Sequence, residues 1–262
     1  MRSFKATSFP RAKKLSLVAY STDKGEILET LRALRSQPNT TRISAIVRAP
    51  SDEDFGDFTV EGRIQLTEDA VFFIGWNDPS RPIRPELEIA LPSPIDPQQY
   101  LLRLRTLGYK IGIETFDRQT LDELIEIQKA TFTDYTNPLT PDDIGSRNIL
   151  AIARSQGRIA SNLVGVIIEL GDFTLVELDH GATLFDHRDY DIMVVLAHLI
   201  EQEVTRRFEN ATMFVQAGTS FPAVNSCCAK FGMTYFGKRL GDALLTVGQQ
   251  PPGFETLNLW FK

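Results

Sequence analysis

The sequence predicts a mixed α/β fold built from two units. Residues 15–47 have the pattern strand–helix–strand, which is typical of an α/β unit. Six prolines follow between Pro79 and Pro97, where the fixed φ and missing N–H of proline disfavour a long helix or a central strand. From Lys110 onward the patterns predict the order β–α–β–β–β–α–β–α–β. We therefore expect a small N-terminal α/β domain at 1–97, ending in a proline-rich linker at 79–97, and a second domain at 98–262.

The first unit should contain four strands and one helix. Apolar, β-favouring runs predict strands at 15–20 and 43–47, with a helix at 27–34 between them. Two further runs, 58–66 and 70–75, read as a hairpin around a short turn.

The second unit begins with a short helix at 100–107 and a strand at 110–115. Thr120 and Glu123 have the spacing of a capping box, which predicts the start of a helix that runs to about Phe132. Apolar spacing predicts a long helix over 192–204. The remaining expected elements are strands at 148–154, 159–168, 173–180 and 212–216, a helix at 222–231, and two closing strands that end at 254–261.

Composition is that of a globular protein, with 42% hydrophobic residues. No apolar run reaches the ~18 residues of a membrane span, and no apolar segment follows the basic N-terminus as in a secretory signal. The two cysteines, Cys227 and Cys228, are adjacent, which favours a reducing compartment over a disulfide framework. We therefore expect a cytoplasmic protein that does not enter a membrane.

Charge is distributed unevenly. The net charge is −6, yet the first 50 residues hold ten Lys and Arg against three Asp and Glu, and the remainder holds 18 against 31. The acidic remainder of the chain excludes a general nucleic-acid binder, and it would attract a cationic small molecule. The basic N-terminal part could contact RNA or another acidic partner, although a solvated basic surface is the simpler interpretation.

Several short segments together resemble a known family. They are, in order along the chain, VEGRI (60–64), FF (72–73), FTDYTNP (132–138), GATL (181–184) ahead of Arg188, NSCCAKFGMTY (225–235) and LNLWFK (257–262). With these segments the sequence resembles the β-lysine N-acetyltransferase family, and its element order resembles that of the GNAT acyltransferase fold.

This resemblance implies transfer of an acyl group from acetyl-CoA or another acyl-CoA to an amine, with Arg188 and Asn225 on the cofactor side. The family holds the diphosphate on backbone N–H groups of an Arg-x-x-Gly-x-Gly turn at the start of the long helix, where glycine allows close approach. Here Asp189 and Asp191 replace the glycines. We expect Asp189 to cap the helix. A like-charge pair ~4 Å apart costs roughly 4 kcal/mol at an effective dielectric of ~20, so the turn should be degenerate.

The acceptor side keeps groups suited to proton transfer. Glu177 and Asp179 should share one face of a strand end, as base or ammonium partner, while His180 on the other face is the second choice of base. Cys228 stands where the family places a tyrosine acid; it could act as an acid or nucleophile, or pack in the core. Tyr135 could line the acceptor cleft or pack in the core.

The expected function is enzymatic: N-acyl transfer to the amine of a small amino acid or diamine. One alternative is a GNAT-fold protein that no longer uses acetyl-CoA and takes another donor, such as an aminoacyl-tRNA or a carrier-bound acyl group, or runs a different biosynthetic reaction. Another is a non-catalytic binding module. A homodimer is compatible with the sequence. No spacing of His, Cys, Asp or Glu typical of a metal site occurs, so no metal is expected.

Overall fold

The computed structural model describes residues 3–9, 14–20, 23–50, 54–67, 69–83, 90–132, 147–245 and 253–262. Its N-terminal part contains β1 (Ser3–Phe9), β2 (Lys14–Tyr20), α1 (Lys24–Arg35), β3 (Arg42–Pro50), β4 (Thr59–Gln65) and β5 (Asp69–Asn77). The prediction omitted β1, which pairs with β2 along its whole length.

The C-terminal part follows the predicted order and closes with the two predicted strands. Its elements are α2 (Pro97–Thr106), β6 (Lys110–Glu114), α3 (Arg118–Thr131), β7 (Ile149–Ser155), β8 (Arg158–Leu170), β9 (Phe173–Thr183), the short 3-10 helix η1 (Phe185–Tyr190), α4 (Ile192–Arg207), β10 (Ala211–Gly218), α5 (Pro222–Lys230), β11 (Thr234–Leu245) and β12 (Gly253–Phe261). The order β–α–β–β–β–α–β–α–β and the mixed α/β class of the fold are confirmed.

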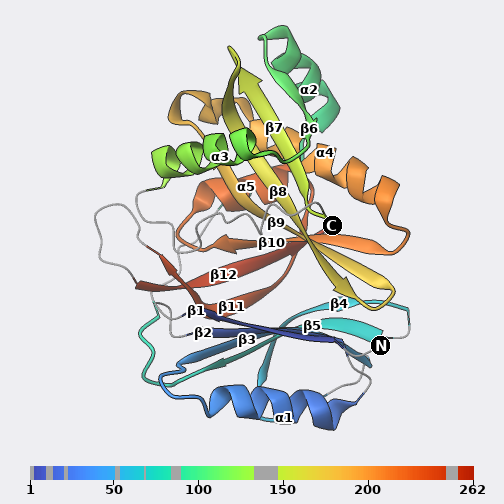
Figure 1. Cartoon of the computed structure of the whole chain (residues 1–262), viewed down its shortest axis with the longest axis vertical. Coiled ribbons are helices and arrows are strands. Elements are labelled where there is room, and N and C mark those ends of the chain that lie inside the picture. The colour runs from blue at the N-terminus through green and yellow to red at the C-terminus, as the bar shows by residue number, and fades with distance from the viewer. Residues whose placement is uncertain are drawn as a thin grey trace.

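All the strands among the described residues belong to one 12-stranded sheet, in the order β1-β2-β3-β5-β4-β11-β12-β10-β9-β8-β7-β6. The pairs β2–β3 and β9–β10 are parallel, and the other neighbours are antiparallel. The N-terminal and C-terminal parts are joined in this sheet by the contact of β4 with β11 (Figure 1).

Helices cover different faces of this sheet. Helix α1 packs on β2, β3 and β5 at the outer side of the N-terminal part (Figure 1). In the C-terminal part α4 packs on one face with α2, while α3 packs on the other face. Strand β7 shows the alternation that this requires, since Ile149 and Ala151 face α4 while Leu150 and Ile152 face α3.

The two parts of the chain share a buried apolar cluster. Strands β3, β4 and β5 pack against strands β8, β9, β10 and β12, so the long sheet folds back on itself. The buried members are Ile46, Ile64, Val71 and Phe73 from the N-terminal part and Leu170, Phe173, Leu175, Phe214 and Leu259 from the C-terminal part. The division into domains at 1–97 and 98–262 stays a prediction, because both the sheet and this cluster run through both parts.

Two glycines permit the junction of β4 with β11. Gly62 and Gly237 form the registered pair that joins these strands. A Cβ atom on Gly237 would lie 2.0 Å from the carbonyl oxygen of Glu61, and one on Gly62 would lie 2.7 Å from Leu259. Glycine inside a strand often marks such a close approach of two backbones.

Two local features concern predicted boundaries. The prolines behave as expected, since the described parts of the linker, 79–83 and 90–96, contain no helix or strand apart from an isolated bridge between Ile83 and Phe254.

The prediction of a capping box that starts at Thr120 was wrong. Helix α3 is capped by Asp117, whose carboxylate accepts the Thr120 N–H at 2.7 Å. The hydrogen bond to the Thr120 N–H lowers the pKa of the Asp117 carboxyl. No helix of the described chain is long and apolar enough to cross a membrane.

Candidate functional site

The site is organised by the point at which β9 and β10 separate. The two strands pair in parallel from Thr174↔Ala211 to Glu177↔Phe214, and no registered pair follows in these two fully described strands. Beyond that point β9 continues to pair with β8, whereas β10 continues to pair with β12. Glu177 therefore lies at the start of an opening between two strands in the middle of the sheet.

Strand β9 carries a bulge just beyond this opening. Asp179 pairs with Val164 and Ala182 pairs with Asn162, so His180 and Gly181 together oppose one residue of β8. His180 takes a left-handed backbone conformation with φ of 52°, and the Asn162 side chain donates to its carbonyl oxygen at 2.7 Å. The bulge interrupts the alternation of side chains that the sequence predicted across Glu177, Asp179 and His180.

Glu177 faces the N-terminal part of the chain. Its neighbours Val176 and Leu178 belong to the core under α4, whereas Leu175 belongs to the cluster shared between the two parts. Because alternate residues of a strand share a face, Glu177 lies on the same face as Leu175. The Gln216 side chain, from β10, donates to Glu177 Oε1 at 2.5 Å.

The environment of Glu177 makes it a plausible base. Burial among protein atoms is the largest cause that raises its pKa to about 7, and the neighbouring charge of Asp179 is the next. The Gln216 hydrogen bond and the charges of Arg239 and Lys14 act in the opposite direction. A carboxylate with a pKa near 7 is half ionised at neutral pH, as general base catalysis requires.

Asp179 and His180 lie close to Glu177 but differ from each other in exposure. The Asp179 side chain is 36% exposed, and its Oδ1 accepts the backbone N–H of His180 at 2.6 Å. The His180 side chain is buried, with its ring Nε2 3.7 Å from Asp179 Oδ2. Asp179 is thus the more accessible of the two to an acceptor molecule.

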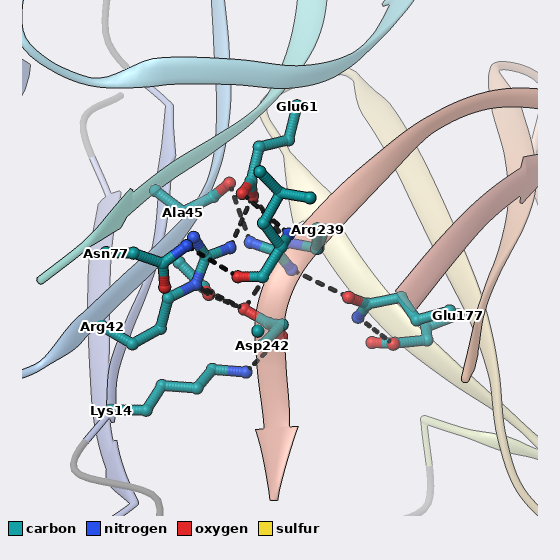
Figure 2. Close-up of polar contacts among 12 residues, drawn as sticks. Lys14, Arg42, Ala45, Glu61, Asn77, Glu177, Arg239 and Asp242 are labelled. Atoms are coloured by element: carbon teal, nitrogen blue, oxygen red, sulfur yellow. Dashed lines mark hydrogen bonds and ion pairs between the residues drawn. The ribbon is translucent and has the colours of Figure 1, made fainter. Parts of the chain in front are cut away.

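A buried charge network lies next to Glu177 and was not predicted from sequence. Arg239 on β11 donates to Gln216 Oε1 at 2.9 Å, and Figure 2 shows the chain of contacts that continues into the N-terminal part. The other ionic members are Lys14, Arg42, Glu61 and Asp242, from β2, β3, β4 and β11. Arg42, Glu61 and Asp242 have side chains that are at most 3% exposed.

The start of α4 differs from the sequence prediction. Asp189 does not cap the helix; it lies in η1, and Asp191 occupies the N-cap position. Asp191 has φ of 53° and makes no side-chain capping bond, because its carboxylate is turned to Lys230 on α5, 2.5 Å away. The prediction that an aspartate consumes the N–H groups of the first turn was therefore wrong. The backbone still takes the left-handed conformation for which glycine is favoured.

Arg188 lies beside this helix start, whereas Asn225 has another role. Arg188 is exposed on η1, and its Nε donates to the carbonyl oxygen of Thr183 at 3.2 Å. The buried Asn225 amide is fully engaged in protein contacts. It donates to Gly218 O at 2.9 Å and Phe221 O at 3.0 Å, and it accepts from Asn258 at 2.8 Å and Trp260 at 3.1 Å. It is an internal brace between α5, β10 and β12 and offers no group to a cofactor.

The two thiols lie in the protein interior. Cys228 is buried in the core under α4, and burial raises its pKa far above the ordinary value. Burial also raises the pKa of Cys227 to about 11, and the charge of Asp191 adds to this shift. Stabilisation of a thiolate was the condition for a nucleophilic Cys228, and this environment does the reverse.

Two further sequence expectations concern Tyr135 and metal ions. Tyr135 falls at 133–146, outside the described residues, so its role stays a prediction. Across the part of the chain that the structure describes, no three His, Cys, Asp or Glu side chains gather as a metal site would require.

A polar hollow of about 620 Å³ lies away from the β9–β10 opening, at the N-terminal end of α3. Its charged groups bind one another. Arg154 pairs with Glu114 at 2.9 Å and Glu123 at 2.6 Å, and Asp117 caps α3. None of the predicted site residues lines this hollow.

Some solved structures resemble this chain over part of its length. No protein-family model matches the sequence, and no curated protein matches it. An acetyltransferase of the GNAT family from Streptococcus pneumoniae is 14% identical, with a TM-score of 0.48, over 58% of this chain and 99% of that chain. The ribosomal-protein-S18-alanine N-acetyltransferase from Escherichia coli is 16% identical, with a TM-score of 0.46, over 58% and 92%. An N-acetyltransferase from Staphylococcus aureus is 10% identical, with a TM-score of 0.46, over 58% and 96%.

Proposed function

We propose that this protein is an N-acyltransferase that moves an acyl group from a coenzyme A thioester to the amine of a small molecule. The observation that carries the proposal is the position of Glu177, where β9 and β10 separate, combined with its pKa of about 7. A small amino acid or a diamine is the proposed acceptor class, supported by the sequence resemblance to β-lysine N-acetyltransferases.

The chemistry of this chain's own residues fits an amine acceptor. An amine must lose a proton before its nitrogen attacks an acyl carbon, and Glu177 would take that proton directly or through one water. Asp179, which is partly exposed on the same strand, would hold the incoming ammonium by charge. The acyl-CoA would supply the activated carbonyl whose C–S bond breaks, with the departing thiolate taking up one proton.

The helix start fits a diphosphate better than its sequence suggests. No side chain caps the first turn of α4. The Val194 N–H donates to the carbonyl oxygen of Asp191 at 3.1 Å, so the N–H groups of Ile192 and Met193, with the helix dipole, would face an anion. Lys230 neutralises Asp191 at 2.5 Å, which reduces the like-charge repulsion expected from that carboxylate. We propose that Arg188, Lys230 and the first-turn N–H groups would hold the diphosphate, with Lys230 shared between it and Asp191.

A turnover assay tests the proposal. Acetyl-CoA is incubated with a panel of small amino acids and diamines, and the released thiol and the N-acetyl product are measured together. We expect one acceptor class to give equal amounts of both, and Glu177→Gln to lower kcat by roughly 100-fold or more. Glu169→Gln is the matched control, because Glu169 is 62% exposed on β8 and pairs only with the exposed Arg147 among the described residues. Product formation at the wild-type rate in Glu177→Gln would contradict the proposal.

A second candidate keeps the acceptor chemistry but changes the donor. Asp186 and Asp189 are exposed on η1, next to the proposed diphosphate position, and their charges favour a donor without a diphosphate. A carrier-bound acyl group is such a donor. Acyl transfer from a carrier, together with no binding of acetyl-CoA, would support this candidate over the first.

A further inference from the structure

A glutamine connects the candidate base to a buried cation. Gln216 lies on β10 with its Nε2 2.5 Å from Glu177 Oε1 and its Oε1 2.9 Å from Arg239 Nη1. The guanidinium group of arginine can only donate, so the amide oxygen must face Arg239 and the amide nitrogen must face Glu177. This fixes the orientation of the glutamine and makes Oε1 of Glu177 an acceptor. The second carboxylate oxygen is then the one that exchanges a proton.

Arg239 is in turn held by the N-terminal part of the chain. Its Nε lies 3.7 Å from Glu61 Oε2, and its Nη2 donates to the carbonyl oxygen of Ala45 at 3.3 Å. Glu61, on β4, also accepts the backbone N–H of Leu240 at 3.1 Å. Figure 2 shows Arg239 between Ala45 of the N-terminal part and Glu177.

Glu61 is itself fixed by close packing and by a second arginine. Arg42 Nη2 lies 2.5 Å from Glu61 Oε2, and the Arg42 side chain is fully buried. Gly75, on the neighbouring strand β5, leaves the space that the Glu61 carboxylate occupies, since a Cβ there would lie 2.3 Å from it. The carboxylate that holds Arg239 therefore has little freedom to move.

The charges of the network favour ionised Glu177. Asp242 completes it, with Lys14 Nζ at 2.6 Å and Arg42 Nε at 3.0 Å. Burial opposes the ionisation of Asp242, but Lys14, Arg239 and Arg42 outweigh it and hold its pKa well below the ordinary value. Two cations of the network, Arg239 and Lys14, act on Glu177 directly and lower its pKa, against burial and the charge of Asp179, which raise it.

We propose that Gln216 and Arg239 are positioning residues for Glu177, and that the N-terminal part of the chain holds Arg239 in place through Glu61. This inference rests on the proposed role of Glu177 as base. It gives the N-terminal part a share in the active site without contact with the substrate. Asp179 on β9 opposes the ionisation of Glu177, while Gln216 on β10, Arg239 on β11 and Lys14 on β2 favour it.

Direct titration of Glu177 tests the proposal without any substrate. Protein labelled with 13C at the glutamate carboxyl carbons is followed by NMR from pH 4 to 9, and the Glu177 signal is assigned by its loss in Glu177→Gln. Gln216→Leu should raise the pKa of Glu177 by roughly one unit, because a donor to the charged form is removed. Gln202→Leu is the control, since Gln202 lies exposed on α4 and should leave the signal unchanged. An unshifted Glu177 in folded Gln216→Leu would overturn the proposal.

The contribution of the N-terminal part needs a double substitution. In the Glu61→Gln background Arg239 loses a charged partner and no longer fixes the Gln216 amide, so the shift caused by Gln216→Leu should fall by at least half. An undiminished shift would overturn the role of Glu61. Far-UV circular dichroism of each variant separates this result from loss of the fold, and Arg239→Lys provides a milder substitution that keeps the charge. A purely structural role would lower the thermal midpoint without moving the Glu177 titration.

The two proposals fail separately. If Glu177 responds as described and no amine is acylated, the network stands and the acyltransferase proposal falls. If amines are acylated with a Glu177 titration that ignores Gln216 and Arg239, the network proposal falls alone.

Discussion

The most specific consequence of the site is a pH dependence of stability that comes from Glu177. Its pKa is raised from an ordinary 4.5 to about 7, first by burial and then by Asp179. The folded state therefore binds this proton more tightly than the unfolded chain. Stability from this group is fully present below about pH 4.5 and is lost as pH rises through about 7. Glu177→Gln removes the group that titrates and should remove this loss.

The size of the effect follows from the shift. Each pKa unit corresponds to about 1.4 kcal/mol, so a shift from 4.5 to about 7 sets an upper bound of about 3 kcal/mol. The Glu177 side chain keeps partial contact with solvent, which screens its charge and reduces the effect below this bound. We expect the stability of Glu177→Gln, relative to wild type, to rise by about 1 to 3 kcal/mol between pH 4.5 and pH 8.

Urea unfolding at a series of pH values measures this difference. Both proteins are unfolded at half-unit steps from pH 4.5 to 8, and the free energies are compared only where the urea dependence is the same. Glu169→Gln serves again as the control, because an exposed carboxylate should give a curve parallel to wild type. A difference between Glu177→Gln and wild type that stays constant over this range would refute the assignment of a buried, titrating Glu177.

Three further predictions concern the fold and the thiols. Gly237→Ala should destabilise the protein by several kcal/mol in urea unfolding, because its Cβ would lie 2.0 Å from a β4 carbonyl oxygen. Gly112→Ala is the control and should not destabilise the protein, because open space surrounds Gly112. Equal stability of the two variants would contradict the described β4–β11 junction. Asp117→Ala should cost about 1 kcal/mol in the same measurement through loss of the α3 cap, and no loss would restore Thr120 as the capping residue. Cys228 should react with a thiol reagent at pH 8 much more slowly than a free cysteine, and rapid labelling of the folded protein would show that its thiol is not buried.

The sequence predicted the fold well where local patterns decide it. The apolar runs at 15–20 and 43–47 lie within β2 and β3, and the apolar spacing from Ile192 to Val204 lies within α4. Such patterns report which face of one element is buried, and they require no knowledge of distant partners. Strand β1, with the sequence SFKATSF, has no continuous apolar run, and it was missed.

The cap of α4 could not be predicted, although the helix does start at Ile192 as expected. Asp189 is a good capping residue by type. It lies within the six residues of η1, however, and so does not reach the N-cap position. The carboxylate that does reach the N-cap position, Asp191, binds Lys230, which lies 39 positions away in the sequence. A long-range ion pair thus decided a feature that the sequence analysis treated as local.

The charge network could not be predicted for the same reason, on a larger scale. Lys14 and Asp242 are 228 positions apart and meet because β11 returns to the N-terminal part. The signals that could have indicated it are glycines inside strands. Gly75 and Gly237 interrupt β5 and β11, and both make room for Glu61 or its backbone. An arginine and a glutamate near such glycines indicate a buried ion pair only once the strand order is known.

Calorimetric titration of acetyl-CoA into the wild-type protein tests the central claim most directly. We predict saturable binding of one acetyl-CoA per chain, weakened at least tenfold in Lys230→Ala, because Asp191 then faces the diphosphate without its counter-ion. Lys129→Ala is the matched control, since Lys129 is exposed on α3 and pairs with Glu126. No heat of binding at millimolar acetyl-CoA would contradict the account.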